Sequence, residues 1–270
     1  MRKFFIWLLE SRDEPFDISF LSFWHIAFLL IIVGSTLLLA YYLNRHPEKK
    51  ERTINAIVIA LVLVYIADFF THPLTRGDFS MNVDKLPFHI CTALCPVAAL
   101  TRFNRHFKKF SEPVSFLSVV APLMYIVYPG SAIGDISPFC YEIIQTFVYH
   151  GLLFSFGVNM IATGEVKPSI RRSWHAVIGI CLIALWASLG NAVYNGEETG
   201  HHYDWFFLTG STFPFVPKPL MPLAVIFCVS AMVYIIYGIY YATVRIISRR
   251  AEKRTAAERE NESEQVAETV

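Results

Sequence analysis

The sequence predicts an all-α, polytopic membrane protein that folds as a bundle of seven transmembrane helices. Three observations predict this class: 54% of the 270 residues are hydrophobic, only 17% are charged, and the apolar residues fall in long blocks. Soluble domains usually carry about a quarter charged residues. The composition therefore excludes a soluble enzyme, a disordered chain and a disulfide scaffold, and a formal net charge of +1 gives no indication of nucleic-acid binding.

Seven apolar stretches approach the roughly 20 residues that a helix needs to cross the hydrocarbon core of a bilayer. The predicted spans are Phe20–Leu43, Thr53–Phe70, Leu86–Thr101, Val114–Tyr128, Phe139–Ile161, Trp174–Tyr194 and Leu220–Ile247. The third and fourth are short and contain Pro96 and Pro122. Proline is tolerated where neighbouring helices satisfy the freed carbonyl. Two buried or re-entrant helices are the alternative for this pair.

The basic residues predict how the spans are oriented. The loops after spans one, three and five and the C-terminal end carry 17 of the 23 lysines and arginines, and the other side carries 6. Basic loops stay in the cytoplasm, so we expect the N-terminus outside and the C-terminus inside. This alternation requires an odd number of spans. The expected organisation is an interfacial segment at 1–18, the seven-helix domain at 19–248 and a charged, disordered cytoplasmic tail at 249–270.

Polar residues in the outer half of four spans form the candidate substrate-binding set. An ionisable group inside a span costs several kcal/mol unless it is paired or hydrated, so each such group is a functional candidate. The candidates are His25, Asp68, Glu142, Tyr149, Asn191 and Asn195. Together they predict a polar cavity that opens to the outer leaflet or the outer solvent. For single residues at helix ends, an ordinary interface position is the alternative.

The candidate catalytic residues are His89, Cys91 and His150. Histidine titrates near neutral pH and serves as a general acid or base, and a thiolate is a nucleophile. His89 and Cys91 stand two residues apart, about 200° around a regular helix, so one helix cannot pair them. A base for Cys91 would come from His150 or His25, and a core cysteine is the alternative. We predict no metal site and no cofactor.

The longest outer loop, Gly196–Pro219, is too apolar for a solvated turn. Its aromatic residues are Tyr203, Trp205, Phe206, Phe207, Phe213 and Phe215. We expect this loop to form a lid or re-entrant segment over the outer cavity. Seven spans also describe retinal proteins, but these need a lysine inside the last span, and Leu220–Ile247 contains none.

Short motifs scattered over most of the chain carry a family resemblance. They are Phe4–Phe5 and Pro15–Phe16 ahead of His25, LPFHIC at residues 86–91, His150, and Asn191 with the aromatic loop that follows it. On these motifs the sequence resembles the YwaF-like bacterial integral membrane proteins and, more distantly, the transmembrane protein 164 family of animals.

The resemblance implies a helical membrane bundle. For the animal branch it also implies acyl transfer between phospholipids, through an acyl intermediate on a cysteine that works with a histidine. That cysteine directly precedes the histidine of the third-span motif, where this sequence has Phe88. The bacterial branch generally lacks a cysteine at this position.

Two functions therefore stay open for a multi-pass protein of the cell membrane. The first is a phospholipid acyltransferase or acyl hydrolase that uses His89 and His150. The second is a non-enzymatic component that binds or transports a small solute or lipid, or serves as an accessory subunit of a transporter. The expected partners are membrane lipids, with a membrane-protein partner and the oligomeric state left open.

Overall fold

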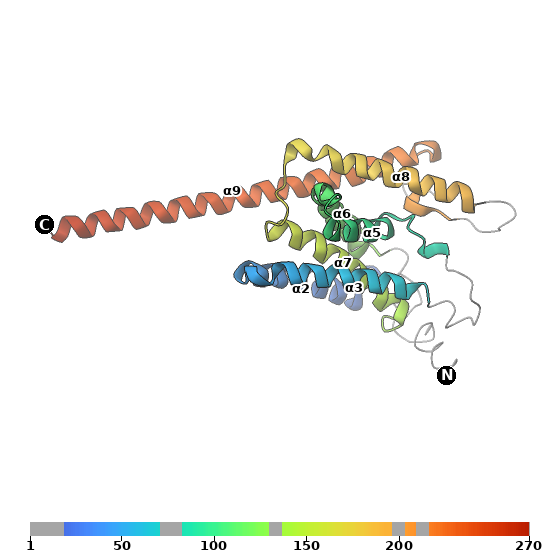
Figure 1. Cartoon of the computed structure of the whole chain (residues 1–270), viewed down its shortest axis with the longest axis horizontal. Helices are drawn as coiled ribbons and strands as arrows, with labels where there is room; N and C mark the ends of the chain where they lie inside the picture. The colour runs from blue at the N-terminus through green and yellow to red at the C-terminus, as the bar shows by residue number, and fades with distance from the viewer. Residues whose placement is uncertain (1–18, 71–82, 130–136, 196–202, 209–215, 270) are drawn as a thin grey trace.

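The computed structural model describes residues 19–70, 83–129, 137–195, 203–208 and 216–269. The predicted interfacial segment at 1–18 lies outside this range. Seven α-helices of 14 residues or more follow one another in the described chain (Figure 1). They are α2 (Phe23–Arg45), α3 (Lys50–Asp68), α5 (Ile90–Phe103), α6 (Ser111–Val127), α7 (Tyr141–Ala162), α8 (Trp174–Tyr194) and α9 (Met221–Thr269). The all-α class is confirmed.

Each predicted span coincides with one of these helices. By length and composition, four segments of the described chain can cross a membrane: Phe23–Arg45, Lys108–Val127, Ile170–Tyr194 and Lys218–Arg250. The shortest helix, α5, begins four residues later than predicted because its N-cap residue, His89, has extended backbone angles. Its 14 residues reach only about 21 Å, less than the roughly 30 Å of a hydrocarbon core.

Helix α6 occupies the centre of the bundle. It contacts α5, α7, α8 and α9, and α2 packs on α7. In its apolar window 67% of the residues are buried, against 22% to 33% in the corresponding windows of α2, α8 and α9. The crossing with α7 is close: a Cβ at Gly157 would lie 2.6 Å from the Ser115 carbonyl oxygen. Small residues at such a crossing let two membrane helices approach.

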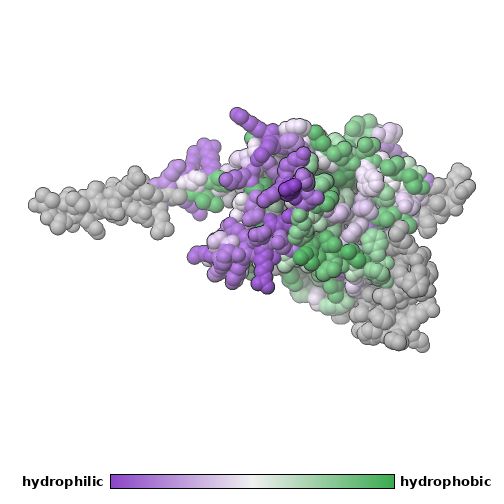
Figure 2. Space-filling view, in the orientation of Figure 1, coloured by the Kyte–Doolittle hydropathy of each residue, from purple (hydrophilic) through white to green (hydrophobic). Residues whose placement is uncertain are grey.

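The loops that carry most of the basic residues meet at one end of the bundle, here called the basic end. The Asn44 side chain donates to the Ala162 carbonyl at 3.2 Å, and the Lys50 ammonium donates to the Thr163 carbonyl at 2.7 Å. These contacts join the loop after α2 to the loop after α7, as an alternating up-and-down chain requires. Figure 2 shows hydrophilic residues gathered toward the side from which α9 projects, and a mostly hydrophobic surface beyond them.

The charged tail continues the last helix. Residues 249–269, for which we expected no regular structure, extend α9 as one helix of 49 residues that projects beyond the bundle (Figure 1). The composition of this segment accounts for the difference, because it is rich in alanine, glutamate, lysine and arginine. These residues have high helix propensity even without a packing partner.

Candidate functional site

The candidate site lies around His150, near the middle of the 22-residue helix α7, and extends from there away from the basic end. The imidazole Nδ1 is 2.7 Å from the carbonyl oxygen of Thr146. A carbonyl only accepts hydrogen bonds, so Nδ1 carries the proton and Nε2 presents a lone pair. Among the described residues, Nε2 has no hydrogen-bond partner. The ring is half-buried and stacks on Tyr125, with ring centroids 3.9 Å apart. A fixed ring thus carries an available basic nitrogen.

His89 lies near His150 and is held in a different way. Its Nδ1 accepts a hydrogen bond from the Phe206 backbone N–H at 3.4 Å, so the neutral ring carries its proton on Nε2. Tyr149, the neighbour of His150 in α7, bonds to the backbone of Cys91, two residues from His89. The structure therefore places the two predicted catalytic histidines where the start of α5 contacts α7.

An ion pair between Lys85 and Asp68 is linked to the same site through Tyr65 and Tyr149. The Lys85 ammonium is 3.0 Å from the carboxylate of Asp68, which is buried at the end of α3. The Tyr65 hydroxyl donates to the Lys85 carbonyl at 2.7 Å, and its ring centroid is 6.0 Å from that of Tyr149. These contacts tie the short helix η2 (Val83–Lys85) to α3 and α7. They also neutralise the Asp68 charge.

Cys91 is the second residue of α5, and no charged side chain accompanies its thiol in the described chain. Tyr149 donates its hydroxyl to the Cys91 backbone carbonyl at 2.8 Å, so the contact between the two residues does not involve the sulfur. Both side chains are buried in the main hydrophobic cluster. Among the described residues, the thiol has neither a hydrogen-bond partner nor a neighbouring charge. Of the two features that stabilise a thiolate, a nearby cation and a helix N-terminus, Cys91 has only the second, and burial among apolar groups opposes it.

Two of the predicted substrate-binding residues do not offer free groups inside the bundle. His25 is buried, its Nδ1 accepts from the Leu21 N–H at 3.0 Å, and its Nε2 lies 2.9 Å from the Ile126 carbonyl. Both ring nitrogens are used to join the start of α2 to the end of α6. Glu142 is exposed in the first turn of α7. The positive end of the helix dipole stabilises an acidic side chain at this position.

Asn191 and Asn195 hold a loop segment. The Asn191 amide accepts from the Trp205 N–H at 2.9 Å and donates to the Trp205 carbonyl at 3.2 Å. Asn195 makes the same pair of bonds with Tyr203, each at 2.6 Å. One face of α8 therefore clamps two alternate residues of the outer loop through their main chain. We call residues 203–208 the lid segment.

The lid segment packs into the bundle, as its aromatic composition predicted. Trp205, Phe206 and Leu208 are buried, although Phe206 and Phe207 have positive φ angles of 63° and 55°. Such left-handed backbone costs roughly 1–2 kcal/mol per residue. The clamp and the packing together must hold it. The indole N–H of Trp205 is buried and has no partner among the described residues, so it is a donor available to an acceptor.

Phe88, at the position where the resemblance implies a cysteine, is a packing residue. Its ring stacks on Trp186 with centroids 5.0 Å apart and lies 4.8 Å from that of Trp205. It also lies against Gly190, where a Cβ would come within 2.5 Å of the ring. The aromatic group at this position therefore supports the lid segment.

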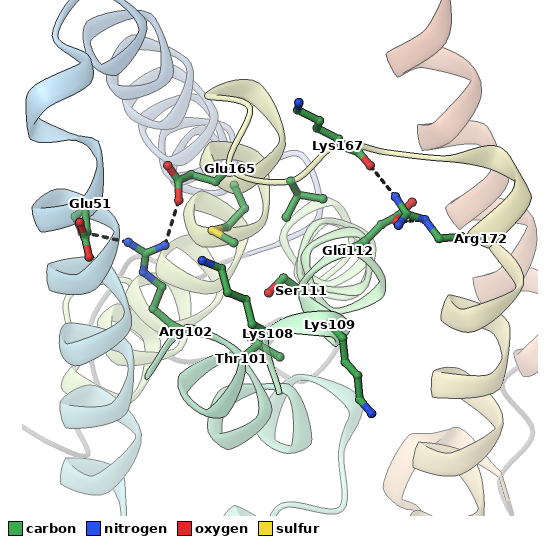
Figure 3. A pocket seen from close by; sticks show the side chains of 12 residues that line it. Glu51, Thr101, Arg102, Lys108, Lys109, Ser111, Glu112, Glu165, Lys167 and Arg172 are labelled. Carbon is green, nitrogen blue, oxygen red and sulfur yellow. Dashed lines mark hydrogen bonds and ion pairs between the residues drawn. The ribbon is translucent and has the colours of Figure 1, made fainter. Parts of the chain in front are cut away.

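The cavity found in the described chain lies at the basic end, and sequence analysis missed it. Its volume is about 390 Å³, and Figure 3 shows the side chains around it. The cavity predicted at the opposite end stays a prediction, because residues 71–82, 130–136, 196–202 and 209–215 lie outside the described residues. Sequence analysis also missed Glu112, which is buried. Glu112 is an acidic residue just ahead of the Val114 span in a loop of basic residues, and this pattern could have indicated an ion pair.

Comparison with known proteins gives one match. No curated protein and no solved structure matches the chain. The family model described as the TMEM164 family matches residues 20–241, more than four fifths of the chain and all seven helices apart from the end of α9. The resemblance to the transmembrane protein 164 family is thereby confirmed, and the apolar helices agree with a membrane protein. On this match, the chain belongs to the TMEM164 family.

Proposed function

We propose that this protein is a multi-pass enzyme of the cell membrane that acts on the acyl ester of a phospholipid, as an acyltransferase or an acyl hydrolase. The observation that carries the proposal is the free Nε2 of His150, on a ring held by the Thr146 carbonyl and by stacking on Tyr125. All seven helices cross the bilayer in this proposal, with the N-terminus outside and the basic end in the cytoplasm. His150 then faces lipid of the outer leaflet.

In the proposed reaction, His150 is the general base. Its Nε2 removes the proton from a hydroxyl group, either of an acceptor lipid or of water, while the hydroxyl oxygen bonds to the ester carbonyl carbon. The tetrahedral intermediate then expels the original alcohol oxygen, which takes the proton back from His150. The products are a new ester, or a fatty acid when water attacks, and the released lysophospholipid. No covalent intermediate on the protein is needed.

This direct transfer agrees with the state of the cysteines. The thiol of Cys91 is buried without a neighbouring cation or hydrogen-bonded base in the described chain, and Phe88 fills the position at which the animal branch is expected to have its nucleophile. We therefore also propose that the chain belongs with the YwaF-like bacterial branch, which generally lacks that cysteine.

One donor is a candidate for stabilising the negative charge on the intermediate. The buried indole N–H of Trp205 lacks a partner in the described chain. A buried unpaired donor costs about 1–3 kcal/mol, which an ester oxygen would recover. Donors placed for a developing oxyanion are often the largest catalytic contribution.

A non-enzymatic membrane component is the second candidate function. The observation in its favour is that Asp68, Tyr149, Asn191, Asn195 and His25 all bond to other protein groups. Such satisfied groups build a rigid bundle without an assembled nucleophile and base. The site would then hold a lipid or small solute, or support a transporter partner, without chemistry.

The test is a pair of matched substitutions, His150→Asn and His175→Asn. Asparagine places an N–H near the position of the histidine Nδ1, so the bond to Thr146 survives while the basic nitrogen is lost. His175 is the control because it repeats the arrangement at the basic end: its Nδ1 is 2.8 Å from the Arg172 carbonyl, and its ring stacks on Trp174.

The assay uses the full chain in phosphatidylcholine nanodiscs that contain a lysophospholipid acceptor. Mass spectrometry measures both transferred acyl chains and released fatty acid. Loss of a general base lowers the rate by about 10²–10⁴-fold, so we expect that loss in His150→Asn and wild-type rates in His175→Asn. Equal rates in His150→Asn and wild type would refute the role of His150. A wild-type protein that neither transfers nor releases acyl chains would favour the second candidate.

A further inference from the structure

The cavity at the basic end is formed where the ends of five helices meet. Its walls come from the start of α3, the end of α5, η3 (Lys108–Phe110) with the start of α6, the end of α7 with the loop after it, and η4 (Ile170–Arg172) ahead of α8. Five cationic and three acidic residues contribute to the lining, with hydroxyl groups and two apolar side chains between them, and the ammonium of one of the five, Lys109, is directed away from it. The lining therefore combines a net positive charge with a defined volume of about 390 Å³.

Two of the acidic groups are already neutralised by arginine. The Arg102 guanidinium is 3.1 Å from the carboxylate of Glu165, and the Arg172 guanidinium is 2.9 Å from that of Glu112 (Figure 3). Glu112 also accepts from the Ser169 N–H at 2.6 Å. These carboxylates serve to hold the arginines and the loop in place. They do not cancel the lysine charges of the lining.

Lys108 and Ser111 offer unoccupied donors inside this cavity. In Figure 3 the Lys108 ammonium extends between Arg102 and Ser111, and it has no carboxylate partner among the described residues. Ser111 is 8% exposed, and within the described chain its hydroxyl lacks a hydrogen-bond partner. Ser111 is also the first residue of α6, so the positive end of a 17-residue helix faces the same space.

The neighbouring lysine is placed differently. The Lys109 ammonium points away from the cavity in Figure 3 and lies 5.1 Å from the centre of the Phe110 ring. Two adjacent lysines of one loop thus differ in direction, and of the two only Lys108 extends into the space beside Ser111. The difference provides a matched control.

We propose that this cavity binds a phosphate group, with Lys108 and Ser111 as its ligands and the positive end of α6 behind them. An ammonium binds phosphate as a point charge, a hydroxyl donates to a phosphate oxygen, and helix N-termini favour anions. The phosphate can belong to a lipid headgroup, as in basic pockets between membrane helices, or to a soluble phosphate ester. The site lies at the basic end, away from His150, and does not rest on the proposed enzyme activity.

The experiment measures ligand binding to the full chain in detergent micelles. The probes are dihexanoyl phosphatidic acid, inorganic phosphate and neutral dihexanoylglycerol, and the readout is the concentration at which each raises the thermal unfolding temperature. We expect phosphatidic acid to stabilise the wild type and dihexanoylglycerol to have no effect. Lys108→Gln and Ser111→Ala should each weaken binding about tenfold or more, and Lys109→Gln should bind as the wild type does.

The two phosphate sources are separated by the probes. Stabilisation by phosphatidic acid alone assigns the site to a lipid headgroup, and stabilisation by inorganic phosphate as well assigns it to soluble phosphate esters. The proposal is overturned if neither probe stabilises the wild type, or if Lys108→Gln and Ser111→Ala leave binding unchanged. It is also overturned if Lys109→Gln weakens binding as much as Lys108→Gln does. Lys108 is exposed, so its substitution leaves the fold intact.

Discussion

Replacing Asn191 with leucine should release the lid segment from α8. Asn191 is 5% exposed and makes two hydrogen bonds to the main chain of Trp205, which is 1% exposed. Leucine has a similar size but leaves a buried N–H and a buried carbonyl without partners. Each such group costs about 1–3 kcal/mol, so docking of the lid segment should weaken by about 2–6 kcal/mol.

The left-handed backbone of Phe206 and Phe207 makes the segment sensitive to this change. Those two residues store roughly 1–2 kcal/mol each, and opening releases that energy. The assay is hydrogen exchange of the peptide that contains residues 203–208, measured by mass spectrometry on the full chain in micelles. Since each 1.4 kcal/mol is a factor of ten, even a 2 kcal/mol loss speeds local exchange about 30-fold.

The control for this experiment is Asn44→Leu. Asn44 is an exposed residue at the basic end whose side chain donates to the Ala40 and Ala162 carbonyls, so its loss should leave the lid segment unchanged. The reasoning is refuted if residues 203–208 exchange at the wild-type rate in Asn191→Leu. It is refuted equally if Asn44→Leu speeds their exchange to the same extent.

Two further predictions concern stability, measured by thermal unfolding of the full chain in micelles. Gly190→Ala should cost about 1–3 kcal/mol of stability through overpacking, because the new Cβ would lie 2.5 Å from the Phe88 ring. The control is Gly238→Ala, where the new Cβ meets open space and stability should not fall. Equal unfolding temperatures for the two variants would contradict this packing. Glu112→Ala should lower the stability by about 2–6 kcal/mol, because it removes a buried acceptor shared by three donors. The control is Glu51→Ala, which changes an exposed residue and should cost little. A Glu112→Ala protein as stable as Glu51→Ala would argue against the acceptor role of Glu112.

The helices could be predicted from the sequence because the length of an apolar block is a local property. Each of the seven blocks became one helix, and the prolines at 96 and 122 lie inside α5 and α6 without ending them. The tail was harder to predict. Its high charge suggested disorder, while its alanine and glutamate content favoured helix, and α9 continues through it.

The candidate site could be predicted only in part. His150 was a functional candidate because histidine serves as a general acid or base, and its Nε2 has no hydrogen-bond partner among the described residues. The clamp by Asn191 was not predictable, because its partner Trp205 reaches it through the tertiary path of a loop. The basic-end cavity was missed for the same reason: Lys108 and Arg172 belong to different loops, and only the packing of α6 between α5 and α8 brings them to one space.

The clamp on α8 recognises main chain alone, which affects how this protein family can diversify. The four hydrogen bonds of the clamp all go to main-chain atoms of residues 203 and 205, so substitution of those two side chains leaves the bonding groups in place. Four residues of helix rise about 6 Å, close to the two-residue repeat of an extended chain. A pair of asparagines spaced by one helical turn can thus bind alternate residues of a loop through the main chain, and this binding does not depend on the loop sequence.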